Sequence, residues 1–249
     1  MAESSERSER ETTSMPAGQL GAADRQLERA GTAKRHAAER AAELVEAGMM
    51  VGLGTGSTVA YLLPALAARK LDLTCVATSP ATEQQARALG LRVRANRDVA
   101  HLDIAIDGAD QVSPDYWLVK GGGGAHTREK VVAAASERFV VIVSADKLVD
   151  ALRAPVPLEL LEFGLAGTLR RLGPCRLRAG SRSPDGGLIA DWLGEVRDPG
   201  VLASRLDADP GVVSHGLFPP EMVTDLVIGG ANGARLVQRE SDEPRPCGP

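Results

Sequence analysis

The strongest constraint in this sequence is a run of four consecutive glycines, Gly121 to Gly124. Glycine has no Cβ, so such a run accepts positive φ angles and exposes its backbone N–H groups. Lys120 precedes the run, and Glu129 follows it at the start of a helical stretch rich in valine and alanine. A glycine loop that opens a helix forms a concave, donor-rich place for anionic oxygens. Four glycines alone would favour a flexible turn, but the charged residues on both sides favour a binding site.

Lysine is used sparingly in this chain. The 29 basic residues include only five lysines, which are Lys34, Lys70, Lys120, Lys130 and Lys147. A compact ammonium differs from a planar guanidinium where a small oxyanion has to be contacted. Chance explains any single lysine, but a lysine at the mouth of the glycine loop and another beyond it support a site there.

Composition excludes several classes of protein. A chain of 249 residues with 43% hydrophobic content can bury one large core, or a core plus a smaller lobe. The net charge of −4 gives no broad basic surface, so we expect no nucleic-acid partner. No apolar run approaches the roughly 20 residues of a membrane span, and no signal or transit peptide is visible. We therefore expect a cytoplasmic protein that does not contact a membrane.

Cysteine and histidine are too few and too scattered to predict a metal centre. The three cysteines show no CxxC pairing, and an odd count argues against a disulfide framework. The four histidines are spread along the chain without ligand spacing. We therefore expect no bound metal ion.

Short apolar runs alternate with helical stretches along most of the chain, which is typical of a doubly wound α/β sheet. The first strand, residues 49–53, leads into a Gly/Ser/Thr turn and a helix over 59–68. Further strands are predicted at 73–78, 91–94, 102–106, 139–143 and 226–228.

Composition and pattern divide the chain into four parts. Residues 1–30 are rich in Ser, Glu and Arg and should be disordered, and residues 240–249 should form a loose tail. Residues 31–155 plus 220–239 should form the large domain, and residues 156–219 a small α+β lobe. The elements expected in this lobe are a helix over 158–172, strands at 175–177 and 188–192, a helix ending at 206, and a strand at 212–217.

Polar groups follow three of the predicted strands. These segments are Thr55-Gly56-Ser57-Thr58, Asp107-Gly108-Ala109-Asp110 and Ala145-Asp146-Lys147. Because open α/β sheets bind ligands at the carboxyl ends of their strands, three such endings indicate a common rim. Ser57 and Thr58 could instead only cap the following helix, although capping and phosphate binding are compatible.

A nicotinamide-binding fold is the obvious alternative, and two details oppose it. The third glycine of the dinucleotide fingerprint would fall at Ser57, and the second strand ends in Thr78-Ser79 instead of an acidic residue. No P-loop sequence is present either. The hydroxyls of the first turn suit a single phosphate or a few sugar hydroxyls.

Four segments taken together resemble ribose-5-phosphate isomerases of the A type. They are Gly54 to Thr58, Asp107 to Asp110, Lys120 to Gly124 and Thr127 to Lys130, at the family's mutual spacing. The similarity extends from about Lys34 to Val237 and includes Gly216-Leu217-Phe218. His126 stands where the family commonly has a small or aliphatic residue, and Pro80 interrupts a loop that is usually richer in serine.

The resemblance implies a Rossmann-like large domain, a ferredoxin-like small lobe, and interconversion of ribose 5-phosphate and ribulose 5-phosphate without a cofactor. By position, Glu129 corresponds to the proton-transferring base and Lys120 to the cation near the developing oxyanion. Asp107 and Asp110 correspond to the carboxylates that handle ring opening and sugar hydroxyls. The positions expected to contact substrate or phosphate also include Lys34, Thr55, Gly56, Ser57, Thr58, Gly108, Ala109, Gly121, Gly122, Gly123 and Lys147. We expect a homodimer or a higher homo-oligomer.

Other interpretations remain open at this point. Glu129 could be an ordinary helix residue paired with a neighbouring base, and Lys34 could be an ordinary solvated helix residue. A sugar-phosphate-sensing regulator would need a DNA-binding module, for which residues 1–30 are too short and polar. A deaminase or lactonase on a similar scaffold would depend on a histidine in the site, and His126 is the one candidate.

Overall fold

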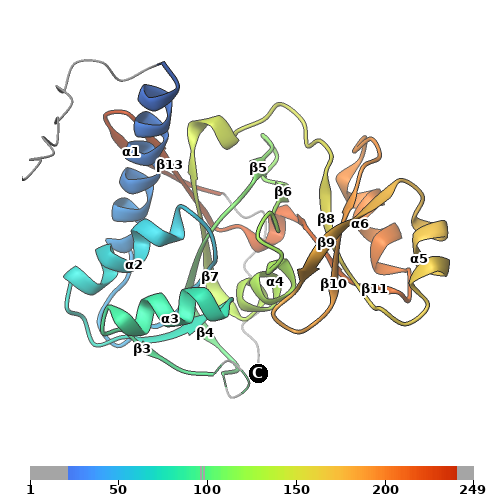
Figure 1. Cartoon of the computed structure of the whole chain (residues 1–249). Coiled ribbons are helices and arrows are strands. Elements are labelled where there is room, and N and C mark those ends of the chain that lie inside the picture. The colour runs from blue at the N-terminus through green and yellow to red at the C-terminus, as the bar shows by residue number, and fades with distance from the viewer. Residues whose placement is uncertain (1–21, 96, 98, 240–249) are drawn as a thin grey trace, which may run out of the picture.

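The computed structural model describes residues 22–95, 97 and 99–239, and its largest element is a seven-stranded sheet (Figure 1). The strand order is β14-β13-β7-β4-β1-β2-β3, and every pairing is parallel except that of β14 with β13. The strands are β1 (Met50–Leu53), β2 (Thr74–Ala77), β3 (Arg92–Val93), β4 (Leu102–Gly108), β7 (Ser136–Ser144), β13 (Asp225–Gly230) and β14 (Gly233–Gln238). The order reverses between β1 and β4, which is the switch point of a doubly wound sheet. The predicted Rossmann-like α/β fold is confirmed.

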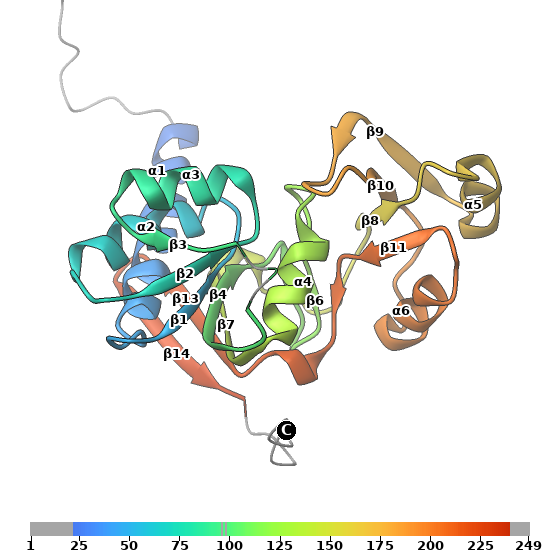
Figure 2. The same cartoon turned by 90° about the horizontal axis from the view of Figure 1, so that it is seen from below.

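Helices cover both faces of this sheet. They are α1 (Ala22–Ala42), α2 (Val59–Ala68), α3 (Pro80–Ala88) and α4 (His126–Ala134). Helices α1, α2 and α3 lie on one face and α4 on the other (Figure 2). Val140 and Ile142 of β7 pack on the first face, and Phe139 and Val141 pack on the second. Because both faces are buried, the strand is continuously apolar. Over the described residues, no helix combines the length and the apolarity that crossing a membrane would need.

Helix α1 packs on the sheet through a stripe of alanines. Ala33, Ala37 and Ala41, spaced by one helical turn, are buried. The contact with β13 is so close that a Cβ on Gly229 would lie 1.8 Å from the Ala33 carbonyl oxygen. Only glycine fits at this crossing. The small side chains therefore fix the distance between the helix and the sheet.

The prediction that residues 1–30 are disordered is wrong for residues 22–30, which are helical. Residues 25–29 are exposed, so contact with the core does not explain their structure. Their sequence, Arg-Gln-Leu-Glu-Arg, consists of strong helix formers, which extend α1 beyond the part that packs. Residues 1–21, with the predicted disorder, and residues 240–249, with the predicted loose tail, lie outside the described residues.

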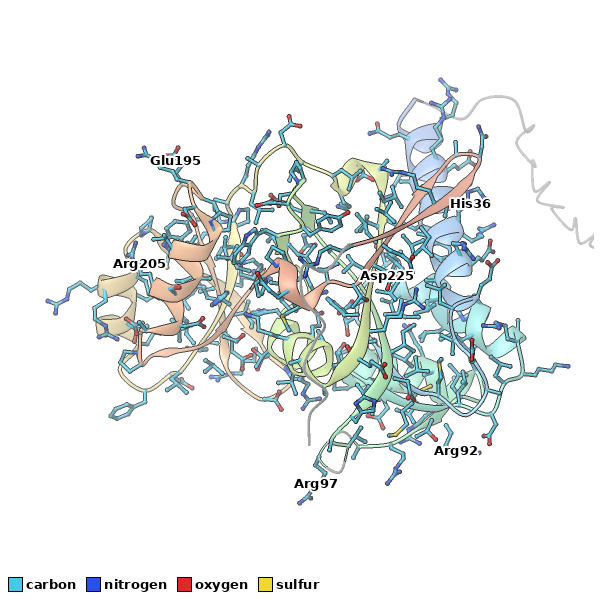
Figure 3. The ribbon with its side chains drawn as sticks, turned by 180° about the vertical axis from the view of Figure 1, so that it is seen from behind. His36, Arg92, Arg97, Glu195, Arg205 and Asp225 are labelled. Atoms are coloured by element: carbon cyan, nitrogen blue, oxygen red, sulfur yellow. The ribbon has the colours of Figure 1, made fainter. Side chains whose placement is uncertain are left out.

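A second, antiparallel sheet is built from residues 156–215 in the order β11-β8-β10-β9. Its elements are β8 (Val156–Leu160), α5 (Leu165–Leu172), β9 (Cys175–Arg182), β10 (Leu188–Trp192), α6 (Pro199–Asp207) and β11 (Val212–His215). The succession β-α-β-β-α-β is the ferredoxin-like arrangement, as expected. We call these residues the small lobe. In Figure 3, Glu195 and Arg205 of the small lobe lie at the opposite end of the molecule from His36.

The predicted helix over 158–172 is wrong in its first part, which forms strand β8. Val156, Leu158 and Leu160 alternate into the core between the small-lobe sheet and its helices, whereas Glu159 points to the other face. This period of two is the pattern of a strand. Gly164, in the left-handed conformation, separates the strand from the true helix α5.

A third, three-stranded sheet joins the two larger units in the order β12-β6-β5. Its strands are β5 (Gln111–Val112), β6 (Leu118–Val119) and β12 (Leu217–Phe218). The single strand predicted over 212–217 is therefore divided at Gly216 between two sheets. The Gly216 carbonyl accepts a hydrogen bond from the Lys120 amide (2.8 Å), and the Gly216 amide donates to the Pro157 carbonyl (2.7 Å).

A chain that begins at Gly31 should keep the melting temperature of the full chain, measured by thermal denaturation. Residues 25–29 are exposed, and Thr32 can cap the shortened helix. A chain that begins at Ala38 is the matched control. It loses the buried Ala33 and Ala37 and should melt several degrees lower. A similar loss in the first truncation would show that residues before Gly31 stabilise the body of the protein.

Candidate active site

A cleft of about 240 Å³ opens at the carboxyl ends of β1, β4 and β7, beside the glycine loop and the start of α4. It is lined by Lys34, Thr55, Gly56, Ser57, Thr58, Val59, Gly108, Ala109, Asp110, Lys120, Gly121, Gly122, Gly123, Glu129 and Lys147. Open α/β sheets bind their ligands in the crevice at the switch point, which here lies between β1 and β4. This cleft is therefore the candidate active site.

The structure brings the predicted site residues together. Every one of them except Asp107 lines the cleft. Asp107 is buried close to the cleft, with its Oδ2 2.9 Å from Nζ of Lys120. Val59, the first residue of α2, is the one lining residue that the sequence did not indicate. The endings of the three strands meet on one rim because β4 lies between β1 and β7 in the sheet.

Lys120 forms a buried ion cluster with two carboxylates. Its Nζ lies 2.9 Å from Asp107 Oδ2 and 3.1 Å from Glu129 Oε2, and all three side chains are only 3–4% exposed. Nζ also donates to the Gly108 carbonyl. Groups with so little exposure are poorly solvated, so the two carboxylates depend on Lys120, and removing this lysine would leave them buried without their cation.

Asp107 is held in place at the end of β4 by backbone amides. Its Oδ1 accepts hydrogen bonds from the amides of Thr55 (3.1 Å) and Gly108 (2.7 Å), which leaves Oδ2 for Lys120. The space for this carboxylate depends on Gly54, where a Cβ would lie 2.0 Å from it. The glycine that directly follows β1 is therefore required by packing against Asp107.

Burial dominates the ionisation of this cluster. Burial and the charge of Asp107 raise the pKa of Glu129, Lys120 opposes both, and the net result is a pKa of about 8. Burial also raises the pKa of Asp107, against Lys120 and the two amides. Burial lowers the pKa of Lys120, but the two carboxylates overcome this and hold it above its ordinary value. Lys120 therefore stays charged, and Glu129 is poised to exchange a proton near neutral pH.

The glycine loop has a defined conformation. Gly121 and Gly124 adopt φ angles of +101° and +75°, which favour glycine. The Gly124 amide donates to the Gly121 carbonyl (3.0 Å), and the Gly122 amide donates to Asp110 Oδ2 (2.8 Å). A Cβ on Gly121 would lie 2.7 Å from the His126 ring. These contacts argue against the flexible turn that four glycines alone would suggest.

Hydroxyl groups and two lysines line another part of the cleft, at the start of α2. Lys34 Nζ donates to Ser57 Oγ (2.9 Å), and Lys147 follows β7. Thr58 occupies the N-cap position of α2 but makes no capping hydrogen bond with its side chain. Its hydroxyl is therefore available to a ligand. An anion at this position would also meet the positive end of the helix dipole.

Two threonines outside the predicted set support the turn after β1. Thr55 Oγ1 lies 2.7 Å from Thr78 Oγ1 and 3.2 Å from Thr82 Oγ1. Thr82 in turn donates to the Gly54 carbonyl (3.0 Å). The sequence showed Thr78 as a polar end to the second strand but gave no sign that Thr78 and Thr82, the latter from α3, both contact Thr55.

His126 lies behind the glycine loop and does not line the cleft. It is fully buried, and burial lowers its pKa to about 3, so the ring is neutral. The structure also offers one group of potential metal ligands over the described residues: His101, Asp103 and Glu137, whose ligand atoms lie within 4.8 Å of one another. It lies at the amino ends of β4 and β7, at the other end of these strands from the cleft.

Comparisons with known proteins agree on one family. The chain matches the model described as ribose 5-phosphate isomerase A (phosphoriboisomerase A) over residues 74–233. A ribose-5-phosphate isomerase A from a Caulobacter species is 48% identical over 215 residues, which cover 80% of this chain and 95% of the relative. The crystal structure of ribose 5-phosphate isomerase A from Neisseria gonorrhoeae superposes with a TM-score of 0.81 at 33% identity, covering 84% of this chain and 97% of that chain. A structure of D-ribose-5-phosphate isomerase in complex with phospho-erythronic acid gives 0.78 at 30% identity, covering 83% and 97%.

Glu129 should make the stability of the protein fall as the pH rises. Unfolded Glu129 ionises near 4.5, whereas the native group keeps its proton up to about 8, so unfolding releases a proton between these values. This contribution is complete below pH 4.5 and is lost as the pH rises through 8. Urea midpoints at pH 5.5 and 8.5 should therefore move closer together in Glu129→Gln than in the parent. Equal pH dependence in both proteins would contradict the raised pKa.

Proposed function

The chain belongs to the ribose 5-phosphate isomerase A family, and from this premise we propose that it interconverts D-ribose 5-phosphate and D-ribulose 5-phosphate, with Glu129 as the proton-transferring base. The observation that carries the proposal is the position of this carboxylate. Glu129 is buried in the wall of the cleft, 3.1 Å from the Lys120 ammonium, with its pKa raised to about 8. A base works best when its pKa lies near the working pH.

The reaction needs one base and a stabilised anion. The aldose and the ketose differ only at C1 and C2, so Glu129 removes a proton from the carbon beside the carbonyl and returns it to the other carbon. One carboxylate on the correct face of the enediolate can perform both transfers. A hydroxyl proton moves between the two oxygens, and there is no net oxidation. Groups of this chain supply both the base and the donors that stabilise the anion.

Lys120 and the glycine loop are the proposed stabilisers of the enediolate oxygen. Fixed donors that face a developing negative charge in a buried site contribute strongly to catalysis. Lys120 is fixed by Asp107, and Gly122 and Gly123 line the same cleft. We assign Asp107, which does not line the cleft, to holding Lys120, and the exposed Asp110 to ring opening and contact with the sugar hydroxyls.

The hydroxyl-rich turn at the start of α2 is the proposed phosphate site. Ser57, Thr58 and the helix N-terminus supply hydrogen-bond donors, and Lys34 and Lys147 supply positive charge. The contact of Lys34 with Ser57 argues against a purely solvated lysine. Self-association to a homodimer or a higher homo-oligomer, and a cytoplasmic location, stay predictions.

The site does not support the two alternative functions, a deaminase or lactonase and a sugar-phosphate-sensing regulator. A deaminase or lactonase would need a histidine in the cleft. Within the described part of the chain, none of the residues that line the cleft is a histidine. His126 is neutral and fully buried behind the loop. A sugar-phosphate-sensing regulator does not require a buried carboxylate with a raised pKa beside a buried lysine.

Glu129→Gln should abolish most of the activity while leaving ligand binding nearly intact. The amide keeps the size of the side chain but accepts no proton, and general-base catalysis contributes about 10²–10⁴-fold, so kcat should fall by at least that order. Exchange of the substrate C2 hydrogen with solvent deuterium should disappear with turnover. The measurements are a coupled isomerase assay, proton NMR and the Kd of phospho-erythronic acid.

The matched control is Glu162→Gln, which changes an exposed carboxylate of the small lobe and should keep the parental kcat. One result would contradict the assignment of Glu129 as the base. If Glu129→Gln isomerises slowly yet exchanges the C2 hydrogen at the parental rate, another group removes the proton, and Asp107 is the first to test.

Lys120→Arg and Lys147→Arg should have different effects. Lys120 is buried between two carboxylates, so a larger planar guanidinium should displace Glu129 and lower kcat by tenfold or more. Lys147 is half-exposed at the rim, so its replacement should mainly raise KM. Steady-state kinetics with ribose 5-phosphate separate the two effects. Parental values for both variants would show that neither lysine contacts the substrate.

A further inference from the structure

We propose that Arg178, on β9 of the small lobe, is a positioning residue that orients the glycine loop so that its N–H groups face the reacting end of the substrate. Arg178 is not among the residues that line the cleft. It therefore acts through the loop and does not touch the substrate. This inference rests on the proposed isomerase function and adds a residue from outside the cleft to it.

Arg178 binds the carbonyl side of the loop. Its Nη1 donates to the carbonyl oxygens of Gly121 (3.1 Å) and Gly122 (2.9 Å). In a planar trans peptide the carbonyl and the following N–H point in opposite directions. Fixing these two carbonyls towards Arg178 therefore turns the amides of Gly122 and Gly123 away from it, towards the cleft that both residues line.

Of the two amides that are turned in this way, one has a partner among the described residues and the other does not. The Gly122 amide donates to Asp110 Oδ2 (2.8 Å), so the peptide between Gly121 and Gly122 is held at both ends. The Gly123 amide has no hydrogen-bond partner within the described part of the chain. It is the donor that remains for an oxygen of the substrate.

Arg178 is itself fixed by a second interaction. Its Nη2 donates to Asp191 Oδ1 (2.6 Å), and its Nε lies 3.1–3.2 Å from both oxygens of that carboxylate. The pair is largely buried, with side-chain exposures of 22% and 8%. Only the planar fork of an arginine can hold a carboxylate on one side and two carbonyls on the other, because a lysine has a single donor atom.

A general tether between the two lobes does not require Arg178. Helix α4 is already joined to the small lobe by the bidentate pair of Arg128 with Asp185 (2.7–2.8 Å) and by a hydrogen bond from Thr127 to Glu159. Neither contact involves the glycine loop. The distinctive feature of Arg178 is its contact with the two loop carbonyls.

The test compares Arg178→Gln with Arg182→Gln in the full chain. Arg182 lies on the same strand but donates to Glu162 and to the Gly186 carbonyl instead of to the glycine loop, so it is the matched control. Loss of one preorganised hydrogen-bond donor to a developing oxyanion lowers kcat by about 10²–10³-fold. A misoriented glycine loop should therefore lower kcat by about tenfold or more. The KM for ribose 5-phosphate should change less than kcat, and Arg182→Gln should keep both values.

Ligand binding separates positioning from general damage. Phospho-erythronic acid carries a carboxylate at the reacting end, so its affinity for Arg178→Gln should fall together with kcat. Inorganic phosphate binds only at the phosphate end, so its affinity should stay at the parental value. Because Arg178→Gln leaves Asp191 unpaired and largely buried, the double variant Arg178→Gln/Asp191→Asn removes both charges and guards against simple unfolding.

The proposal is overturned if the double variant is folded and turns over at the parental rate, or if phosphate and phospho-erythronic acid weaken alike. A parent protein that does not isomerise ribose 5-phosphate would instead overturn the proposed function, so the two failures are distinguishable.

Discussion

The site depends on one buried ammonium held between two buried carboxylates. Lys120 directly follows β6, Asp107 lies in β4 and Glu129 in α4, and none of the three side chains is more than 4% exposed. The ammonium offsets the cost of ionising either carboxylate in this buried place, and the carboxylates offset the cost of burying the ammonium. Two carboxylates against one lysine also leave an excess negative charge, and this excess, added to burial, raises the pKa of Glu129. The requirement to bury the cluster and the ability to move a proton therefore have the same physical origin.

The backbone around the cluster is arranged to keep Lys120 in place. The Lys120 amide donates to the Gly216 carbonyl, where the chain passes from the small-lobe sheet to the three-stranded sheet. A Cβ on Gly216 would lie 2.2 Å from the Lys120 carbonyl oxygen, so this crossing requires glycine. On the other side, Gly54 leaves room for Asp107. Two glycines far apart in sequence thus define the space that the ion cluster fills.

The sequence predicted the features that depend on local pattern. Apolar runs with polar endings gave the parallel strands and the rim, and the glycine run gave the loop beside Lys120. The sequence failed where a local pattern was ambiguous: it predicted a helix from residue 158, although residues 158–160 belong to strand β8, and it predicted disorder for the exposed start of α1. The sequence could not predict the roles of Arg178 and Thr82. Nothing in the neighbouring sequence shows that Arg178 contacts the glycine loop or that Thr82 contacts the turn after β1.

The glycine loop shows why conformational freedom and rigidity are compatible in one segment. Glycine loses more backbone entropy on folding than other residues, so four in a row are ordered only if specific contacts hold them. Here the Asp110 carboxylate accepts a hydrogen bond from one loop amide, and the Arg178 guanidinium donates hydrogen bonds to two loop carbonyls. Partners of opposite charge match the two ends of the peptide dipole, so they hold the loop in one orientation. Donors oriented before the reaction need no rearrangement when negative charge develops, and this preorganisation is what makes such donors effective.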